Sequence, residues 1–63
     1  MNFWDYIKLS REDKIELLYE EGESEEGLGK GKYIFTLYDF WVEVTENSDG
    51  DIIYLKAHLF SPH

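Results

Sequence analysis

The chain has 63 residues, no cysteine and a formal net charge of −8, from 14 acidic and 6 basic side chains. A chain this short buries only about 60% of the surface that its unfolded form exposes, so we expect one small domain over residues 1–63. The lack of thiols excludes disulfides and thiolate metal sites, and the negative charge disfavours direct binding to nucleic acid, whose phosphates it repels. No apolar run reaches the roughly 18 residues of a membrane span, and the N-terminus lacks a secretory pattern, so we expect a soluble cytoplasmic protein that binds no membrane.

The first strong signal along the chain is a helix that we expect over residues 10–21. Ser10 can cap its start, because its side-chain oxygen can accept a hydrogen bond from an amide in the first turn. Apolar residues then recur at i, i+3 and i+4, which places them on one helix face, and Gly22 is a natural stop. Asn2 can cap a short turn before this helix in the same way.

Glutamates are concentrated on the outer side of this helix and just after it. Three of them recur every fourth residue, which repels slightly, and others crowd the negative end of the helix dipole, where cations are preferred. We interpret the set as a solvated face and, in the alternative, as an acidic docking surface. Its members are Glu12, Glu16, Glu20, Glu21, Glu23, Glu25 and Glu26.

Residues 22–32, GESEEGLGKGK, contain four glycines, and we expect them to form a loop. Glycine and lysine alternate near its end, as in a phosphate cradle. The spacing fits neither G-x-G-x-x-G nor the Walker pattern, and we expect a strand rather than a helix to follow. The segment therefore predicts no nucleotide site and no cofactor.

The next stretch, YIFTLYDFWVEV, changes the parity of its apolar residues in the middle. Six of them occupy odd positions before Tyr38 and even positions after Asp39, namely Tyr33, Phe35, Leu37, Phe40, Val42 and Val44. A two-residue turn at Tyr38 and Asp39 puts these six on one face of a hairpin, so we expect strands over residues 33–37 and 40–46. The turn lacks the glycine that such turns favour because of their positive φ angles.

The segment ENSDGD predicts a second turn, followed by a strand over residues 51–59. Pairing Glu46 with Asp51 sets Ile53 opposite Val44 and adds a third apolar row to the same face. The segment also resembles part of a calcium loop, but two ligand positions carry Thr and Lys, so we expect no metal. The sequence therefore predicts an α+β fold with one main N-terminal helix packed on a three-stranded antiparallel β-meander.

The order of FWDYIKLS, DKIELLYEEG, a variable loop, LYDFWVEV and IIYLKA resembles a group of short bacterial proteins of uncharacterised function. The resemblance covers most of the chain through general motifs. It implies a helix with a small antiparallel sheet, and it implies no activity. This chain departs from the pattern at Tyr38-Asp39, where the relatives favour glycine, and at His58, where an aromatic residue is usual.

The second face of the predicted sheet carries aromatic and apolar side chains, which mark a contact surface. The predicted interface residues are Trp41, Tyr54, Ile34, Ile52 and Lys56. In the expected register Trp41 lies opposite Lys56, as a cation–π pair requires. Residues 1–9 either fold over this face or pack beside the helix, and the sequence leaves both arrangements open.

Catalytic chemistry has few candidates in this chain. The expected register sets Asp39 opposite His58, with Glu43 on the same face, but no serine is expected nearby and a cross-strand ion pair explains these residues. We therefore predict no enzyme and no catalytic residues. We predict a protein-binding or scaffold module that self-associates through the aromatic sheet face, with a homodimer as the commonest outcome. The alternative is an acidic nucleic-acid mimic that inhibits a basic nucleic-acid-binding protein.

Overall fold

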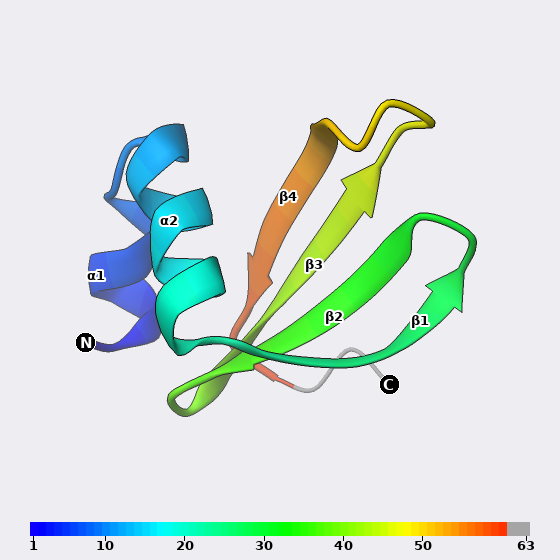
Figure 1. The fold of residues 1–63 in the computed structure, drawn as a ribbon. Helices are drawn as coiled ribbons and strands as arrows, with labels where there is room; N and C mark the ends of the chain where they lie inside the picture. Colours follow the sequence, from blue (N-terminus) through cyan, green and yellow to red (C-terminus); the bar gives the residue numbers. More distant parts are fainter. Residues whose placement is uncertain (61–63) are drawn as a thin grey trace.

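The computed structural model describes residues 1–60, and for residues 26–28 it describes the backbone alone. Two helices precede four strands, in the order α1 (Phe3–Ile7), α2 (Arg11–Glu21), β1 (Glu23–Gly29), β2 (Lys32–Leu37), β3 (Phe40–Glu46) and β4 (Ile52–His58). The strands form one antiparallel sheet in chain order, and both helices lie against one face of it (Figure 1). No helix in this part of the chain is long and apolar enough to cross a membrane.

The structure has the predicted α+β class, but it contains four strands instead of three and two helices instead of one main helix. The additional strand, β1, lies in the segment that we expected to be a loop. Glu23 pairs with Thr36 and Glu25 with Ile34, and a bulge interrupts the ladder before Gly29. β1 consists mostly of glutamate and glycine, which are depleted in strands. Its side chains therefore do not indicate a strand, although its backbone pairs with β2. Because β1 covers β2, residues 33–37 lie inside the sheet and not at its edge.

Side-chain caps begin both helices. The side chain of Asn2 accepts a hydrogen bond from the amide of Asp5 at 2.9 Å, and that of Ser10 accepts one from the amide of Asp13 at 3.2 Å. These bonds satisfy amides that the first helical turn leaves without a partner. At the other end of α2, a Cβ on Gly22 would lie 2.7 Å from a helix carbonyl oxygen, so the chain needs glycine there to leave the helix.

The core lies between the helices and the sheet. Its buried side chains are Tyr6 and Leu18 from the helices and Leu37, Phe40, Val42 and Val44 from β2 and β3. The ring of Tyr6 lies 5.3 Å from that of Phe40, and its hydroxyl donates to the carbonyl of Lys14 at 2.9 Å. Tyr6 therefore joins α1 to both the sheet and α2. Burying each such apolar side chain contributes about 1.5–3 kcal/mol, so this layer is the main source of stability.

The hairpin between β2 and β3 has the register that the parity change predicts. Leu37 pairs with Phe40, and Tyr33 pairs with Val44. Tyr38 adopts a φ of 57°, which is the left-handed conformation that a two-residue hairpin turn needs. Its ring lies 6.4 Å from the ring of Phe40. The alternation of apolar residues therefore fixes the register although the turn lacks glycine.

The register between β3 and β4 differs from the prediction by two residues. Leu55, and not Ile53, lies opposite Val44. One residue of the shift comes from the turn, where the amide of Asn47 donates to the carbonyl of Asp51 at 2.9 Å and closes a smaller loop. The other comes from a bulge within the ladder. Bulges insert an unpaired residue that side-chain patterns do not reveal.

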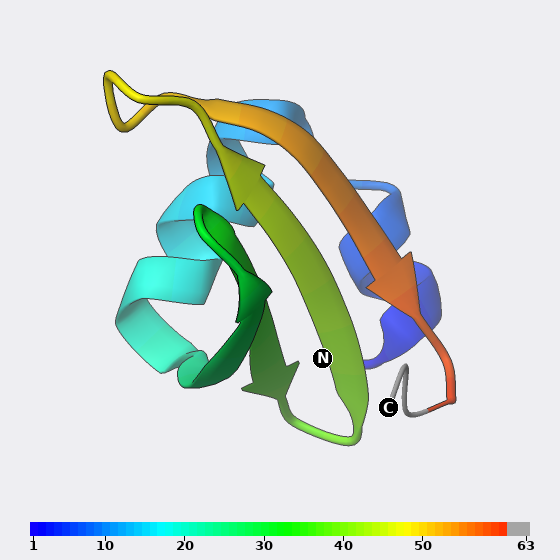
Figure 2. The ribbon, with the colours of Figure 1, turned by 90° about the vertical axis from the view of Figure 1, so that its right-hand side faces the viewer.

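Two single-residue shifts restore the parity of the strand, so most of β4 keeps its predicted face. Leu55 and Ala57 pack against the core as expected. At the bulge the faces are exchanged, because Ile53 is 63% exposed and Ile52 packs against the core in its place. Seen from the side, β4 runs along one outer edge of the sheet (Figure 2).

Candidate functional site

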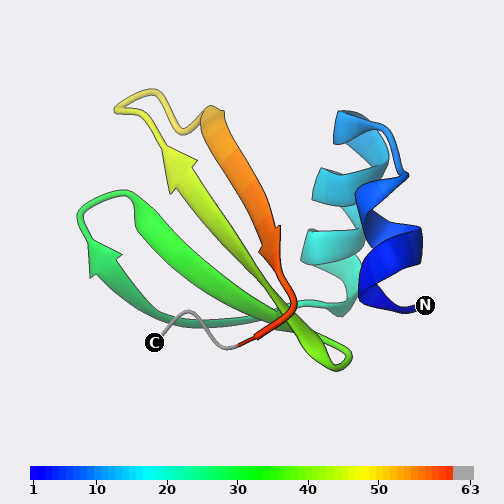
Figure 3. The same ribbon diagram turned by 180° about the vertical axis from the view of Figure 1, so that it is seen from behind.

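The sheet face opposite the helices is the first candidate surface. Neither a helix nor another strand of residues 1–60 lies over it (Figure 3). Trp41 stands on the inner strand β3, close to the β2–β3 turn, where it is half-buried and pairs with Thr36 on one side and His58 on the other. Tyr54 lies farther along β4 and is 44% exposed. The face therefore presents one partly covered and one accessible aromatic ring.

The five predicted interface residues are divided between three positions. Trp41, Tyr54 and Lys56 stand on the open face. Ile34 shares that face but is fully buried, so it cannot contact a partner, and Ile52 lies on the core side because of the bulge. The expected pairing of Trp41 with Lys56 is wrong, because the shifted register sets Lys56 opposite Glu43.

A contact between a histidine and a glutamate crosses the open face between β3 and β4. Nε2 of His58 lies 3.0 Å from Oε1 of Glu43, and both side chains are half-buried. His58 pairs with Trp41 and not with Asp39, which belongs to the β2–β3 turn. The serines of the described chain lie at the start of α2, in β1 and in the β3–β4 turn. Among the described residues, this pair joins two strands and forms no hydrogen bond with a serine hydroxyl, which a serine triad requires.

The predicted acidic surface follows α2 and the start of β1. Its exposed members are Glu12, Glu16, Glu20, Glu21, Glu23 and Glu25, and the side chain of Glu26 lies outside the described residues. Glu25 accepts a hydrogen bond from the hydroxyl of Thr36 at 3.1 Å. None of the four glutamates of α2 forms an ion pair with a described residue. Their charge is therefore directed to solvent.

The outer edge of β4 is basic and apolar. The guanidinium of Arg11 donates to the carbonyl of Ile52, and a hollow of about 240 Å³ next to it is lined by Arg11, Lys14, Ile53, Tyr54 and Leu55. β4 itself contains no acidic residue. An unpaired strand edge of this kind can accept an added strand, so this edge extends the open face as a contact surface.

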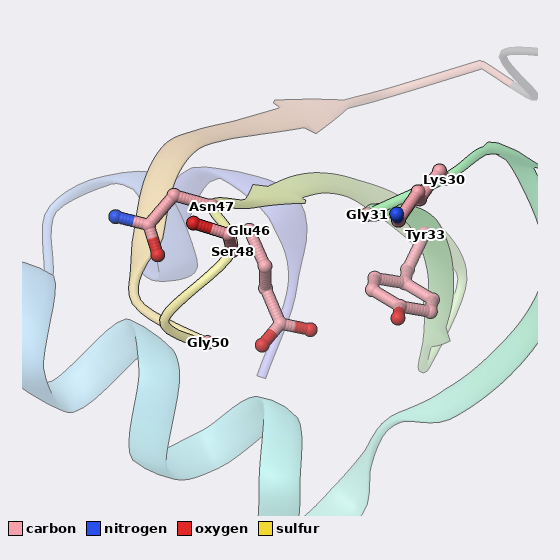
Figure 4. Close-up of a pocket in the computed structure, with 7 residues that line it drawn as sticks. All are labelled: Lys30, Gly31, Tyr33, Glu46, Asn47, Ser48 and Gly50. Carbon is pink, nitrogen blue, oxygen red and sulfur yellow. The ribbon is translucent and has the colours of Figure 1, made fainter.

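A larger hollow, of about 440 Å³, lies where two turns meet at the end of the sheet (Figure 4). Its volume is within the range of small-molecule sites. Its lining residues are Lys30 and Gly31 from the β1–β2 turn, Tyr33 from β2, Glu46 from β3, and Asn47, Ser48 and Gly50 from the β3–β4 turn. From the sequence we expected a loop and a turn here, and a ligand site in neither. The predicted hairpin contains the missing signal, because extending its register by two residues places Gly31 beside Glu46.

Both turns around this hollow have a defined backbone. The side-chain oxygen of Asn47 accepts from the amides of Asp49 and Asp51 at 2.9 and 3.0 Å. The amide of Glu46 donates to the carbonyl of Gly31 at 2.7 Å, which joins one turn to the other. Gly31 has a φ of 77°, and a Cβ there would lie 2.7 Å from the carbonyl oxygen of Glu46. Glycine is therefore required for this close approach.

Among the described residues, no group of three histidine or carboxylate side chains is placed to hold a metal ion. Comparisons with protein-family models, with curated proteins and with solved structures find no match. The resemblance to short bacterial proteins therefore stays a prediction.

Proposed function

We propose that this chain is a small non-enzymatic protein-binding module that self-associates through its open sheet face. The observation that carries the proposal is the position of the N-terminal aromatic residues. Phe3 and Tyr6 lie 6.0 and 5.3 Å from Phe40, on the core side of the sheet. They therefore do not cover Trp41 and Tyr54, and aromatic rings of this kind are the commonest anchors of protein interfaces.

The size of the molecule supports a surface that includes the β4 edge. A stable interface buries about 800 Å² on each partner. The whole chain exposes 4388 Å², so a stable dimer buries nearly a fifth of its surface. The open face supplies Trp41, Tyr54 and Lys56, and the adjoining edge adds the exposed side chain of Ile53. An interface of sufficient area therefore needs the face and the edge together.

Light scattering over a concentration series, at low and high salt, tests the proposal. We expect a dimer mass that persists at high salt, because an apolar interface is insensitive to screening. Tyr54→Ala should shift the series towards the monomer, whereas Tyr19→Ala should not, because Tyr19 is 65% exposed on α2, away from the sheet face. A monomer throughout for the unmodified chain contradicts self-association, and equal behaviour of the two variants contradicts the assignment to the sheet face.

The unpaired glutamates of α2 favour a second candidate function. We propose, as the alternative, that the chain mimics nucleic acid and occupies the groove of a basic nucleic-acid-binding protein. Competition with DNA for such proteins, at low and high salt, tests it. Glu16→Gln combined with Glu20→Gln should weaken competition, and high salt should abolish it. A competition that is equally strong at high salt rejects this alternative.

A further inference from the structure

Glu46 carries a half-buried carboxylate at the edge of the 440 Å³ hollow. Within the described part of the chain, no hydrogen-bond donor or cation pairs with this carboxylate. The side chain of Glu46 is on the core face of β3, two residues after Val44. Val44 is the last buried residue of this strand, so Glu46 lies just outside the core. Partial burial of a charge is unfavourable unless a partner compensates it. The hollow therefore contains an anionic group suited to a cationic ligand.

Tyr33 supplies the second recognition element. It pairs with Val44, so its ring is on the same face of the sheet as Glu46, and it is 37% exposed. In Figure 4 the Tyr33 ring and the Glu46 carboxylate extend to the same side of the sheet, with open space between them. An aromatic ring attracts a cation placed over its face. Ring and carboxylate thus favour the same type of ligand.

The surrounding backbone is already organised for binding. The bond from the Glu46 amide to the Gly31 carbonyl fixes the distance between the two turns, and the Asn47 side chain holds its own turn through two amides. A site that is fixed before binding loses less conformational freedom when a ligand enters. On the opposite rim, Lys30 disfavours a ligand that is cationic at both ends.

We propose that this hollow binds a guanidinium group, with the Glu46 carboxylate as its ion-pair partner and the Tyr33 ring stacked on its plane. A guanidinium fits because it is planar, stacks on aromatic rings and bonds a carboxylate through two parallel N–H groups. The group belongs either to a small molecule or to an arginine side chain of a partner protein. This site is separate from the open sheet face and does not depend on self-association.

Titration with butylguanidinium, which carries a single positive charge, and separately with a blocked Gly-Arg-Gly peptide, tests the site by amide NMR shifts. We expect saturable shifts at Gly31, Glu46 and Gly50, and none with butylurea, the neutral analogue of butylguanidinium. Tighter binding of butylguanidinium supports a small-molecule ligand, and tighter binding of the peptide supports an arginine side chain. Shifts confined to the amides of α2 overturn the proposal, because they indicate general attraction to the acidic helix.

Two matched variants separate the site from the overall charge. Glu46→Gln and Glu12→Gln remove the same charge, but Glu12 lies on α2, outside the hollow. Loss of a charge-assisted bond should weaken butylguanidinium binding about tenfold or more in Glu46→Gln, with little change in Glu12→Gln. Tyr33→Leu should weaken it about threefold to tenfold. Equal affinities of the two glutamine variants refute the assignment, and unchanged amide spectra without ligand confirm that each variant folds.

Discussion

Tyr6 allows a quantitative prediction about stability, because its ring is fully buried and its hydroxyl has one defined partner. The hydroxyl donates to the carbonyl of Lys14 at 2.9 Å. That carbonyl lies inside α2, where helix geometry also supplies an amide four residues on, so Tyr6→Phe does not leave it without a donor. We therefore expect Tyr6→Phe to lower the free energy of unfolding by only about 1 kcal/mol at neutral pH.

The difference in the free energy of unfolding between the unmodified chain and Tyr6→Phe should depend on pH. Burial raises the pKa of the Tyr6 phenol above its ordinary value of 10.0 in the folded state. The raised pKa contributes stability below pH 10.0, and this contribution is lost as the pH rises, because the unfolded chain then releases a proton that the folded chain retains. One pH unit above the ordinary pKa, the loss is about 1.4 kcal/mol. Phenylalanine has no proton to release, so the variant should become as stable as the unmodified chain, or slightly more stable.

Urea unfolding at about pH 8 and about pH 11 measures this change, since each pH gives one free energy for each protein. All other ionisable groups are the same in both proteins, so their contributions cancel in the difference. Tyr19→Phe is the control, and it should change stability little at either pH because Tyr19 is exposed on α2. If the Tyr6→Phe difference stays the same at both pH values, the burial argument is refuted.

Three further substitutions test the packing and the turns by urea unfolding. Leu18→Ala empties a buried position between α2 and the sheet and should cost about 2–5 kcal/mol, whereas Tyr19→Ala, its exposed neighbour, should stay within about 0.5 kcal/mol. Gly31→Ala introduces both a left-handed alanine and a contact of 2.7 Å with the carbonyl of Glu46, so it should cost at least about 1 kcal/mol, and a neutral result contradicts the close approach of the turns. Asn47→Ala removes the acceptor of two turn amides and should cost about 1–2 kcal/mol, with the largest amide shifts in that turn.

Side-chain alternation was sufficient to predict the central hairpin. The parity change around Tyr38 specified the pairing of Leu37 with Phe40, even though the turn residues argued against it. The sequence did not predict β1, because this strand is held by backbone pairing with β2. Its glutamates and glycines are residues that are depleted in strands, so they do not indicate one. The predicted register of β4 against β3 was wrong by two residues. The turn closed by Asn47 accounts for one residue of this shift, and the bulge accounts for the other.

The candidate surfaces were predicted only in part, for related reasons. The positions of Trp41 and Tyr54 follow from strand parity, which the shift of two residues leaves unchanged. Burial of Ile34 does not follow from parity, which places Ile34 on the face opposite the helices, beside Glu43. The site around the unpaired Glu46 carboxylate was not predicted, because it forms only where two turns meet in space. The order of residues along the chain does not show that the two turns meet.

The order of the strands has a consequence for how the chain folds. Each strand pairs with its neighbour in the sequence, so every ladder of the sheet closes across a short loop. Such ladders lose little loop entropy, and chains with local contacts fold faster than most chains rich in strands. The contacts that join distant segments are those of α1 and α2 with the later strands, such as Tyr6 with Phe40 and Arg11 with Ile52. Docking of the helices should therefore be the slow step, and substitutions at Tyr6 should alter the folding rate more than substitutions in the β1–β2 ladder.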